Sequence, residues 1–264
     1  QEIGIGAEVV DDLRHEPAPV DRICRRQLDV PSGELLSKGF VAENLLDAVL
    51  RIVKIPLDRD VTDTALMVIN AQYGVEVGTI NQFRYTEQFH KPVIFVVNQL
   101  DNDKADFDNT VHQLRENYGA KAVQIQYPVQ TGAAFNAVVD VLKMKMYRWK
   151  PEGGKPDVLD IPAEELDKAT ELHKALVEAA AEHDDTLMEK FFEEGTLSED
   201  DMRAGIRAGL VSRGMFPIFC VCAGKDMCVR RTLEFLGNVV PCTDKMPRPV
   251  TTEGIEVTAD PAGP

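Results

Sequence analysis

The chain has 264 residues, of which 44% are hydrophobic and 28% are charged, so it can form one α/β domain with an insert or two small domains. No apolar run approaches the ~18 residues of a membrane span, and the first residues lack the basic and then apolar order of a signal peptide. The net charge is −15, and an acidic surface does not bind phosphate backbones, which argues against direct contact with DNA or RNA.

Residues 1–63 have the least regular pattern of the chain. A helix is predicted over Ala42–Val53 from its amphipathic spacing, whereas the preceding stretch from Asp11 to Lys38 is loop-like and contains three prolines. Gly4-Ile5-Gly6 is a fragment of a dinucleotide fingerprint, but it lacks a full preceding strand and a third glycine. We therefore treat residues 1–63 as an atypical N-terminal segment.

From residue 64 onward, strand patterns alternate with helix patterns. Short apolar runs predict three strands: Ala65–Ala71, Val93–Val97 and the more polar Ala122–Tyr127. Helical spacing predicts three helices: Val75–His90, Asp103–Tyr118 and Ala133–Trp149, the last from Phe135, Val138, Val139 and Leu142. This alternation is typical of βαβ units, so we expect an α/β fold with a doubly wound, mostly parallel sheet.

Residues 151–212 interrupt the alternation with helices alone. The predicted helices are Ala163–His183 after Pro162, Thr186–Glu194 before Gly195, and a third from Ser198 to about Val211. Residues 152–201 hold 17 Asp or Glu and four Lys or Arg, a net charge of −13, which leaves −2 for the rest of the chain. Such a surface is either simply solvated or a docking face for a protein partner, and the sequence leaves both open.

After this insert the sheet is expected to resume. Phe216–Cys222 is predicted as a strand and Asp226–Gly237 as the helix that follows it, and residues 241–264 contain five prolines, which is typical of an extended linker. The expected segments are therefore 1–63, 64–150, 151–212, 213–240 and 241–264.

The five cysteines are Cys24, Cys220, Cys222, Cys228 and Cys242. An odd number without a repeated spacing favours free thiols in a reducing cytoplasm. No C-x-x-C pair occurs, and Cys220 and Cys222 lie in or directly after an apolar run, so we expect no metal site. No feature of the sequence points to an obligate dimer, and a monomer is expected.

Two loops at strand ends carry residues that suit a binding site. Asn98-Gln99-Leu100-Asp101 follows the strand Val93–Val97, and Cys222-Ala223-Gly224-Lys225 follows the strand from Phe216. In a doubly wound sheet, ligands bind at the carboxyl ends of the strands. A carboxylate at Asp101 can accept both the N1–H and the N2 amine of guanine, Asn98 can tie the loops together, and the backbone N–H of Ala223 can serve O6. Taken alone, the N-x-x-D pattern is weak evidence and is more typical of a helix-capping turn.

A longer resemblance favours the first interpretation. The segments that carry it are GVEVGT (Gly74–Thr79), the NQLD loop, IQYPVQTGAAFNAVVDVLKMK (Ile125–Lys145) and the helical stretch Ile161–Leu210. In this order they resemble the guanine-nucleotide domain of bacterial elongation factor G, from about Thr64 to Arg248. The resemblance implies a P-loop-NTPase-like fold, a helical subdomain inserted before the last strand, binding of GTP or GDP with Mg²⁺, and a second domain after the linker.

The resemblance also implies site residues and partners. Asn98, Gln99 and Asp101 match the guanine-specificity motif N-K-x-D, with Gln99 in place of Lys, and Cys222-Ala223-Gly224 match the S-A-x motif, with Cys222 in place of Ser. It implies action on the ribosome in translocation, with the acidic insert facing the stalk protein, in the cytoplasm.

Two motifs of this class are missing from the sequence. No G-x-x-x-x-G-K-[ST] string occurs, since Ser37-Lys38-Gly39 has these residues in the wrong order, and no D-T-P-G-H precedes Thr64. Asn44–Leu50 only faintly resembles the helix after a phosphate loop. Two hypotheses follow: a nucleotide-binding translation factor domain, or a non-hydrolysing relative or fragment that serves as a protein-binding module. Catalytic residues are not identified, and we expect inefficient GTP hydrolysis.

Overall fold

The computed structural model describes residues 63–150, 154–241, 246, 248 and 256. The helix predicted at Ala42–Val53 and the motifs considered at Gly4–Gly6, Ser37–Gly39 and Asn44–Leu50 lie outside these residues. The chain divides into two compact units: the first consists of residues 1–35 and 247–264, and the second of residues 36–246. All the helices and strands of the described residues belong to the second unit, and none of those helices is long and apolar enough to cross a membrane.

A four-stranded parallel sheet forms the centre of this unit. Its strands are β1 (Ala65–Asn70), β2 (Val93–Asn98), β8 (Phe216–Cys220) and β3 (Ala122–Gln124), in the order β1-β2-β8-β3. Every residue of the central strands β2 and β8 is buried, as expected for strands covered on both faces. The parallel strands predicted from the apolar runs are therefore confirmed.

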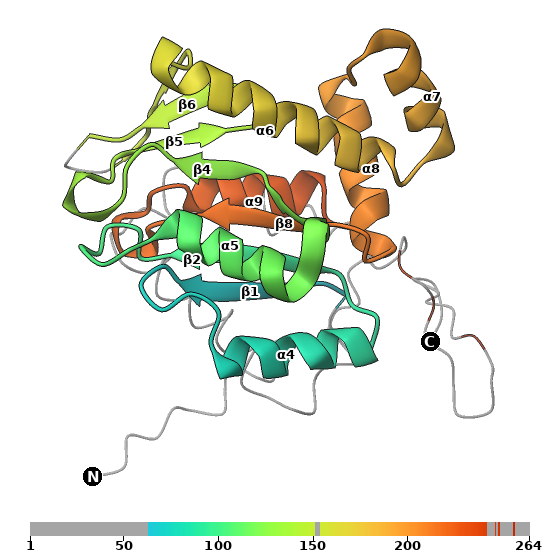
Figure 1. Cartoon of the computed structure of the whole chain (residues 1–264), viewed down its shortest axis with the longest axis horizontal. Helices are drawn as coiled ribbons and strands as arrows, with labels where there is room; N and C mark the ends of the chain where they lie inside the picture. Colours follow the sequence, from blue (N-terminus) through green and yellow to red (C-terminus); the bar gives the residue numbers. More distant parts are fainter. Residues whose placement is uncertain (1–62, 151–153, 242–245, 247, 249–255, 257–264) are drawn as a thin grey trace, which may run out of the picture. The chain divides into compact units, whose positions relative to one another are not determined.

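Helices cover both faces of this sheet (Figure 1). On one face, Phe83 of α4 (Val77–Gln88) and Tyr118 of α5 (Phe107–Tyr118) pack on Phe95 and Phe216. On the other face, α9 (Val229–Asn238) packs through Phe235, 4.6 Å between ring centroids from Phe219. Phe216 and Phe219 of β8 point to opposite faces because side chains alternate along a strand. The sheet is doubly wound, as predicted.

The predicted helix Ala133–Trp149 is wrong. This segment forms two antiparallel strands, β5 (Ala137–Asp140) and β6 (Lys145–Arg148), preceded by a 3₁₀ turn, η2 (Gly132–Ala134). The apolar spacing that suggested a helix is also compatible with a buried strand, because all four residues of β5 are buried. The β-branched pair at Val138 and Val139 favours the extended backbone.

The predicted strand Ala122–Tyr127 is divided between two sheets. It follows the 3₁₀ turn η1 (Gly119–Lys121) as β3, and then continues as β4 (Gln126–Pro128), which pairs antiparallel with β5. Ile125 lies between the two strands and donates its backbone N–H to Ile218 at 3.0 Å. The second sheet has the order β4-β5-β6-β7, in which β7 (Asp157–Leu159) lies in the insert that we predicted to be all helical.

The three helices of the insert are confirmed, with bounds close to the predicted ones. They are α6 (Ala163–Ala181), α7 (Asp185–Glu194) and α8 (Glu199–Val211). Pro162 is the N-cap of α6, Gly195 ends α7 in the left-handed region with φ 71°, and the Ser198 side chain accepts from the backbone N–H of Asp201 at 3.1 Å. The capping residues seen in the sequence thus set these helix ends.

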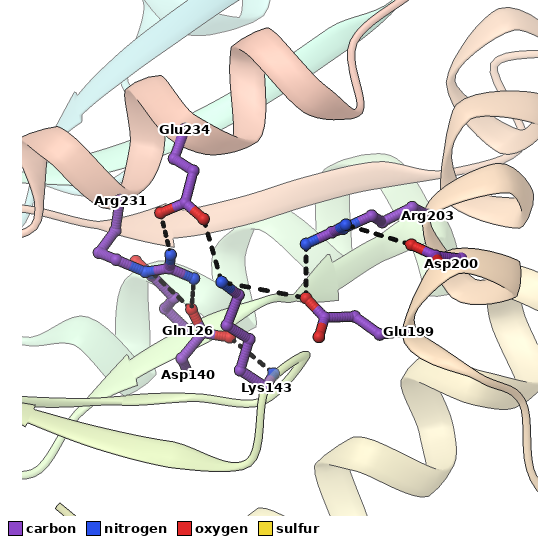
Figure 2. Close-up of polar contacts among 8 residues, drawn as sticks. All are labelled: Gln126, Asp140, Lys143, Glu199, Asp200, Arg203, Arg231 and Glu234. Atoms are coloured by element: carbon purple, nitrogen blue, oxygen red, sulfur yellow. Dashed lines mark hydrogen bonds and ion pairs between the residues drawn. The ribbon is translucent and has the colours of Figure 1, made fainter. Parts of the chain in front are cut away.

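A network of charged side chains connects the insert, the antiparallel sheet and α9 (Figure 2). At its centre, the buried carboxylate of Asp140 on β5 lies 2.7 Å from the guanidinium of Arg231 on α9. Arg231 also pairs with Glu234, and Lys143 Nζ lies 3.0 Å from Oε1 of Glu234. The remaining members link α8 and β4 to this centre: Glu199, Asp200, Arg203 and Gln126. The helical insert is therefore attached to the parallel-sheet domain by specific polar contacts.

Candidate functional site

The two predicted loops lie side by side because β2 and β8 are neighbours in the parallel sheet. Each loop leaves the carboxyl end of its strand, and the strands stay paired up to this point, with Val221 donating its backbone N–H to Val97 at 2.8 Å. The buried side chain of Asn98 then accepts from the backbone N–H of Ala223 at 3.1 Å. Asn98 thus ties the two loops together, which is the role expected of it.

Backbone contacts fix the shape of the Asn98–Asp101 loop. Gln99 has φ 63°, in the left-handed region, and its carbonyl accepts from the N–H of Asn102 at 3.1 Å. Leu100 is fully buried, and its carbonyl accepts from the N–H of Gly132 at 2.8 Å. The loop is therefore anchored by an apolar side chain on one side of Asp101 and by a turn hydrogen bond on the other.

The carboxylate of Asp101 is held by two side chains of the other loop. Lys225 Nζ lies 3.1 Å from Asp101 Oδ2, and the thiol of Cys222 is hydrogen-bonded to the same carboxylate. Partial burial acts to raise the pKa of Asp101, but these hydrogen bonds and the charge of Lys225 bring it below its usual value of 3.8. Asp101 is ionised at neutral pH and can only accept hydrogen bonds.

The thiol of Cys222 serves as a donor here. Burial, together with its hydrogen bond to Asp101, raises the pKa of Cys222 to about 12, so the thiol stays protonated. A serine hydroxyl at this position would offer the same donor, which is why the cysteine is compatible with the S-A-x motif. Among the described residues, Cys220, Cys222 and Cys228 are buried free thiols, and no group of three or more His, Cys, Asp or Glu could hold a metal ion.

The other predicted site residues have different surroundings. Gln99 does not extend freely, because its Oε1 accepts from Asn70 Nδ2 at 2.8 Å, at the end of β1. We expected the backbone N–H of Ala223 to bind guanine O6, but in this structure it donates to the side-chain oxygen of Asn98. Gly224 lies in the 3₁₀ turn η3 (Ala223–Lys225), where a Cβ would meet nothing within 4 Å.

Sequence reasoning placed Lys225 in the second loop without giving it a role, and it missed Asn70. Asn70 is paired in register with Asn98 across β1 and β2, a relation that only the strand pairing reveals. Lys225 directly follows the Cys222–Gly224 motif, so its position was a usable signal, but its contact with Asp101 depends on the fold.

The described residues fit a guanine base better than they fit phosphates. Asp101 provides an ionised double acceptor for adjacent N–H donors. In contrast, carboxylates occupy the N-terminal ends of two helices at the same edge, since Glu76 caps α4 and Asp106 caps α5. A negative side chain at a helix N-terminus takes the place that an anion such as phosphate would occupy.

Comparisons with known proteins identify the fold and the family. A crystal structure from Thermus thermophilus is similar with a TM-score of 0.63 and 23% sequence identity, over 70% of this chain and 27% of that chain, which supports the P-loop-NTPase-like fold. The present chain thus spans about a quarter of the length of that relative. The family model of the elongation factor Tu GTP binding domain matches residues 59–242, a range that includes both loops and the whole insert. The chain belongs to the family of elongation factor Tu GTP-binding domains.

Proposed function

We propose that the chain is the guanine-nucleotide-binding domain of a ribosome-associated elongation factor that acts in translocation. The observation that carries this proposal is the ionised carboxylate of Asp101, held at the carboxyl edge of the sheet by Lys225 and Cys222 within the range that matches the family. Family membership gives guanine-nucleotide binding, and the resemblance of the insert to that of elongation factor G supports the translocation factor.

The proposed recognition depends on the donor and acceptor pattern of the base. Guanine presents N1–H and the N2 amine side by side, and the two oxygens of Asp101 accept both. Adenine does not offer this pair, so the acceptor positions of Asp101 that face the base would stay unpaired. Leaving such a group unpaired can discriminate by about 10⁴-fold. Asn98 contributes by keeping the Cys222–Gly224 loop against Asp101.

GTP hydrolysis is proposed to be slow. Phosphoryl transfer depends on positioning of the phosphates and on charge stabilisation by a Lys, a hydroxyl and Mg²⁺. The sequence has neither the phosphate-loop string nor D-T-P-G-H, and Gln99 replaces a lysine of the specificity motif. We therefore expect guanine-selective binding with weak dependence on Mg²⁺.

Titration with fluorescent GDP, GTP and ADP analogues, each with and without Mg²⁺, tests the base site. GDP should bind in preference to ADP, and Asp101→Asn should lose GDP while gaining xanthosine diphosphate, whose extra oxygen pairs with an amide. Asp108→Asn on α5 is the matched control, because this carboxylate is 79% exposed and lies outside the site. Equal binding of GDP and ADP would refute the proposal, and tight Mg²⁺-dependent binding would refute the expectation of weak dependence on Mg²⁺.

The acidic insert is proposed to face the ribosomal stalk protein. Residues 152–201 carry a net charge of −13, and Phe192 on α7 is 78% exposed beside Phe191, so the surface offers both charge and an aromatic side chain. Capture of the stalk protein should weaken as salt rises, because exposed charges are screened. Capture that is unchanged at high salt would exclude an electrostatic role. We also propose a monomer in the cytoplasm, where the free thiols would remain reduced.

A further inference from the structure

Asp101 has more hydrogen-bonding capacity than a base would use. A carboxylate offers about four lone-pair positions on its two oxygens. The two donors of guanine occupy one position on each oxygen, which leaves two. In the structure, Asp101 has two side-chain donors, the ammonium of Lys225 on Oδ2 and the thiol of Cys222. These two side-chain donors match the two positions that the base would leave, and the backbone N–H of Asp101 also donates to this carboxylate.

The backbone around Lys225 keeps its ammonium group near Asp101. Its N–H donates to the carbonyl of Cys222 at 3.2 Å, closing the 3₁₀ turn η3. Cys222 and Met227 form a two-way bridge, with both N–H···O distances at 3.1 Å, so the turn is pinned at its base. Asp226 adopts the left-handed conformation with φ 54°, which sends the chain back toward this bridge. Lys225 is thus carried by a short, closed loop.

The position of charge in the site differs from the family motif. Position 99, where the motif has a lysine, holds a glutamine whose Oε1 is bound to Asn70 and which has no charge. A cation that contacts the carboxylate comes from the opposite loop, at Lys225. The Lys225 side chain is 47% exposed and that of Asp101 is 28% exposed, so the pair is open to solvent and to a ligand.

We propose that Lys225 is a positioning residue for guanine recognition, which orients the Asp101 carboxylate through Oδ2 and leaves its remaining lone pairs for the base. The proposal rests on the proposed function of Asp101, because Lys225 acts through that carboxylate. Lys225 lowers the pKa of the carboxylate and limits its rotation, so a bound guanine finds both acceptor oxygens in place.

The binding test compares Lys225→Met, Lys225→Arg and Lys174→Met, with fluorescent GDP as the probe. Lys225→Met should weaken GDP binding by about three- to fivefold, the range of an ion pair of this exposure. Lys225→Arg should restore binding, because arginine keeps the charge and donates to carboxylates. Lys174→Met on α6 makes the same change in net charge at a 74% exposed side chain and should bind GDP as the parent does.

A second measurement does not depend on nucleotide. The pKa of Asp101, followed by NMR in the ligand-free protein, should lie below 3.8 in the parent and rise in Lys225→Met, because a hydrogen bond and a charge that lower it are removed. An unchanged pKa would show that Lys225 does not act on this carboxylate. Far-UV circular dichroism and thermal unfolding of each variant establish that it is folded.

The outcomes separate the two proposals. Should Asp101→Asn bind GDP as well as the parent, the base site itself is wrong. When Asp101→Asn loses GDP but Lys225→Met does not, the positioning role alone is wrong. Tighter GDP binding by Lys225→Met would also overturn it, since Lys225 would then compete with the base. An unchanged pKa of Asp101 in Lys225→Met would refute the inference even if no nucleotide bound to the parent.

Discussion

The buried ion pair between Asp140 and Arg231 should be the most sensitive polar contact of the described residues. The Asp140 side chain is 2% exposed and that of Arg231 is 13% exposed, and their closest atoms are 2.7 Å apart. Arg231 also lies 4.9 Å from the ring of Tyr147, so water has little access to its guanidinium. Asp140→Asn removes the charge with almost no change of volume and leaves the guanidinium without its buried anion.

The expected cost is about 3 kcal/mol of unfolding free energy. Removing one partner of a buried pair costs about 3–5 kcal/mol, because the other charge stays buried without compensation. The lower end of this range applies here, because Glu234 remains in contact with Arg231 in the variant. The Glu234 side chain is 43% exposed, so it compensates the buried guanidinium only in part. The backbone N–H of Lys143 donates to Oδ1 of Asp140 at 2.9 Å. Asp140→Asn weakens this hydrogen bond as well, because its acceptor is no longer charged. Figure 2 shows these contacts converging on Asp140.

Urea unfolding followed by circular dichroism measures this cost from the midpoint and the slope. Asp160→Asn is the matched control: its carboxylate lies 2.6 Å from Lys145 Nζ but is 91% exposed, so the midpoint should not move. The double variant Asp140→Leu with Arg231→Met should recover much of the loss, because apolar side chains leave no buried charge. Equal midpoints for Asp140→Asn and Asp160→Asn would refute the assignment of this pair as buried and compensating.

Three further changes test packing and titration. Gly205→Ala should destabilise the insert by about 1–3 kcal/mol, because the new Cβ would lie 2.3 Å from the carbonyl oxygen of Ala180. Gly78→Ala should stabilise α4 by about 0.5–1 kcal/mol, because a Cβ at Gly78 meets nothing within 4 Å. Urea unfolding midpoints measure both changes. Burial, and then the charge of Glu87, raises the pKa of Tyr118 from 10.0 to about 12. The stability that the neutral Tyr118 hydroxyl contributes is therefore complete below pH 10 and is lost as the pH rises to 12. Between pH 9 and about 11, Tyr118→Phe should thus lose less stability than the parent does. Thermal unfolding at each pH measures the difference.

Local signals in the sequence were sufficient for the parallel sheet and for the helices of the insert. The continuous apolar run of β2 and the cap at Ser198 are each contained within a few residues, and both were predicted correctly. The hairpin of β5 and β6 was not, because Val138 and Val139 fit a helix and a strand equally well by spacing. Pairing of β5 with β4 and β6 decides in favour of the strand, and this depends on tertiary structure.

The position of the candidate site could be predicted from the sequence, but its side-chain contacts could not. The loops at Asn98 and Cys222 follow strands, so their meeting at one edge of the sheet follows from the parallel topology alone. The side-chain partners do not follow from it. Gln99 binding to Asn70, and Lys225 binding to Asp101, join residues from different loops, and no local pattern specifies which polar side chains meet there.

Stability and function are expected to separate within one short stretch of chain. Lys225 in η3 and Arg231 in the first turn of α9 are both cations paired with a carboxylate from a distant segment. Because the Lys225 pair is exposed, its loss should scarcely change the unfolding free energy while it alters a carboxylate that is proposed to bind the base. Because the Arg231 pair is buried, its loss should lower the unfolding free energy and leave Asp101 in contact with the same two donors. Burial, and not the type of ion pair, therefore determines which property each cation controls.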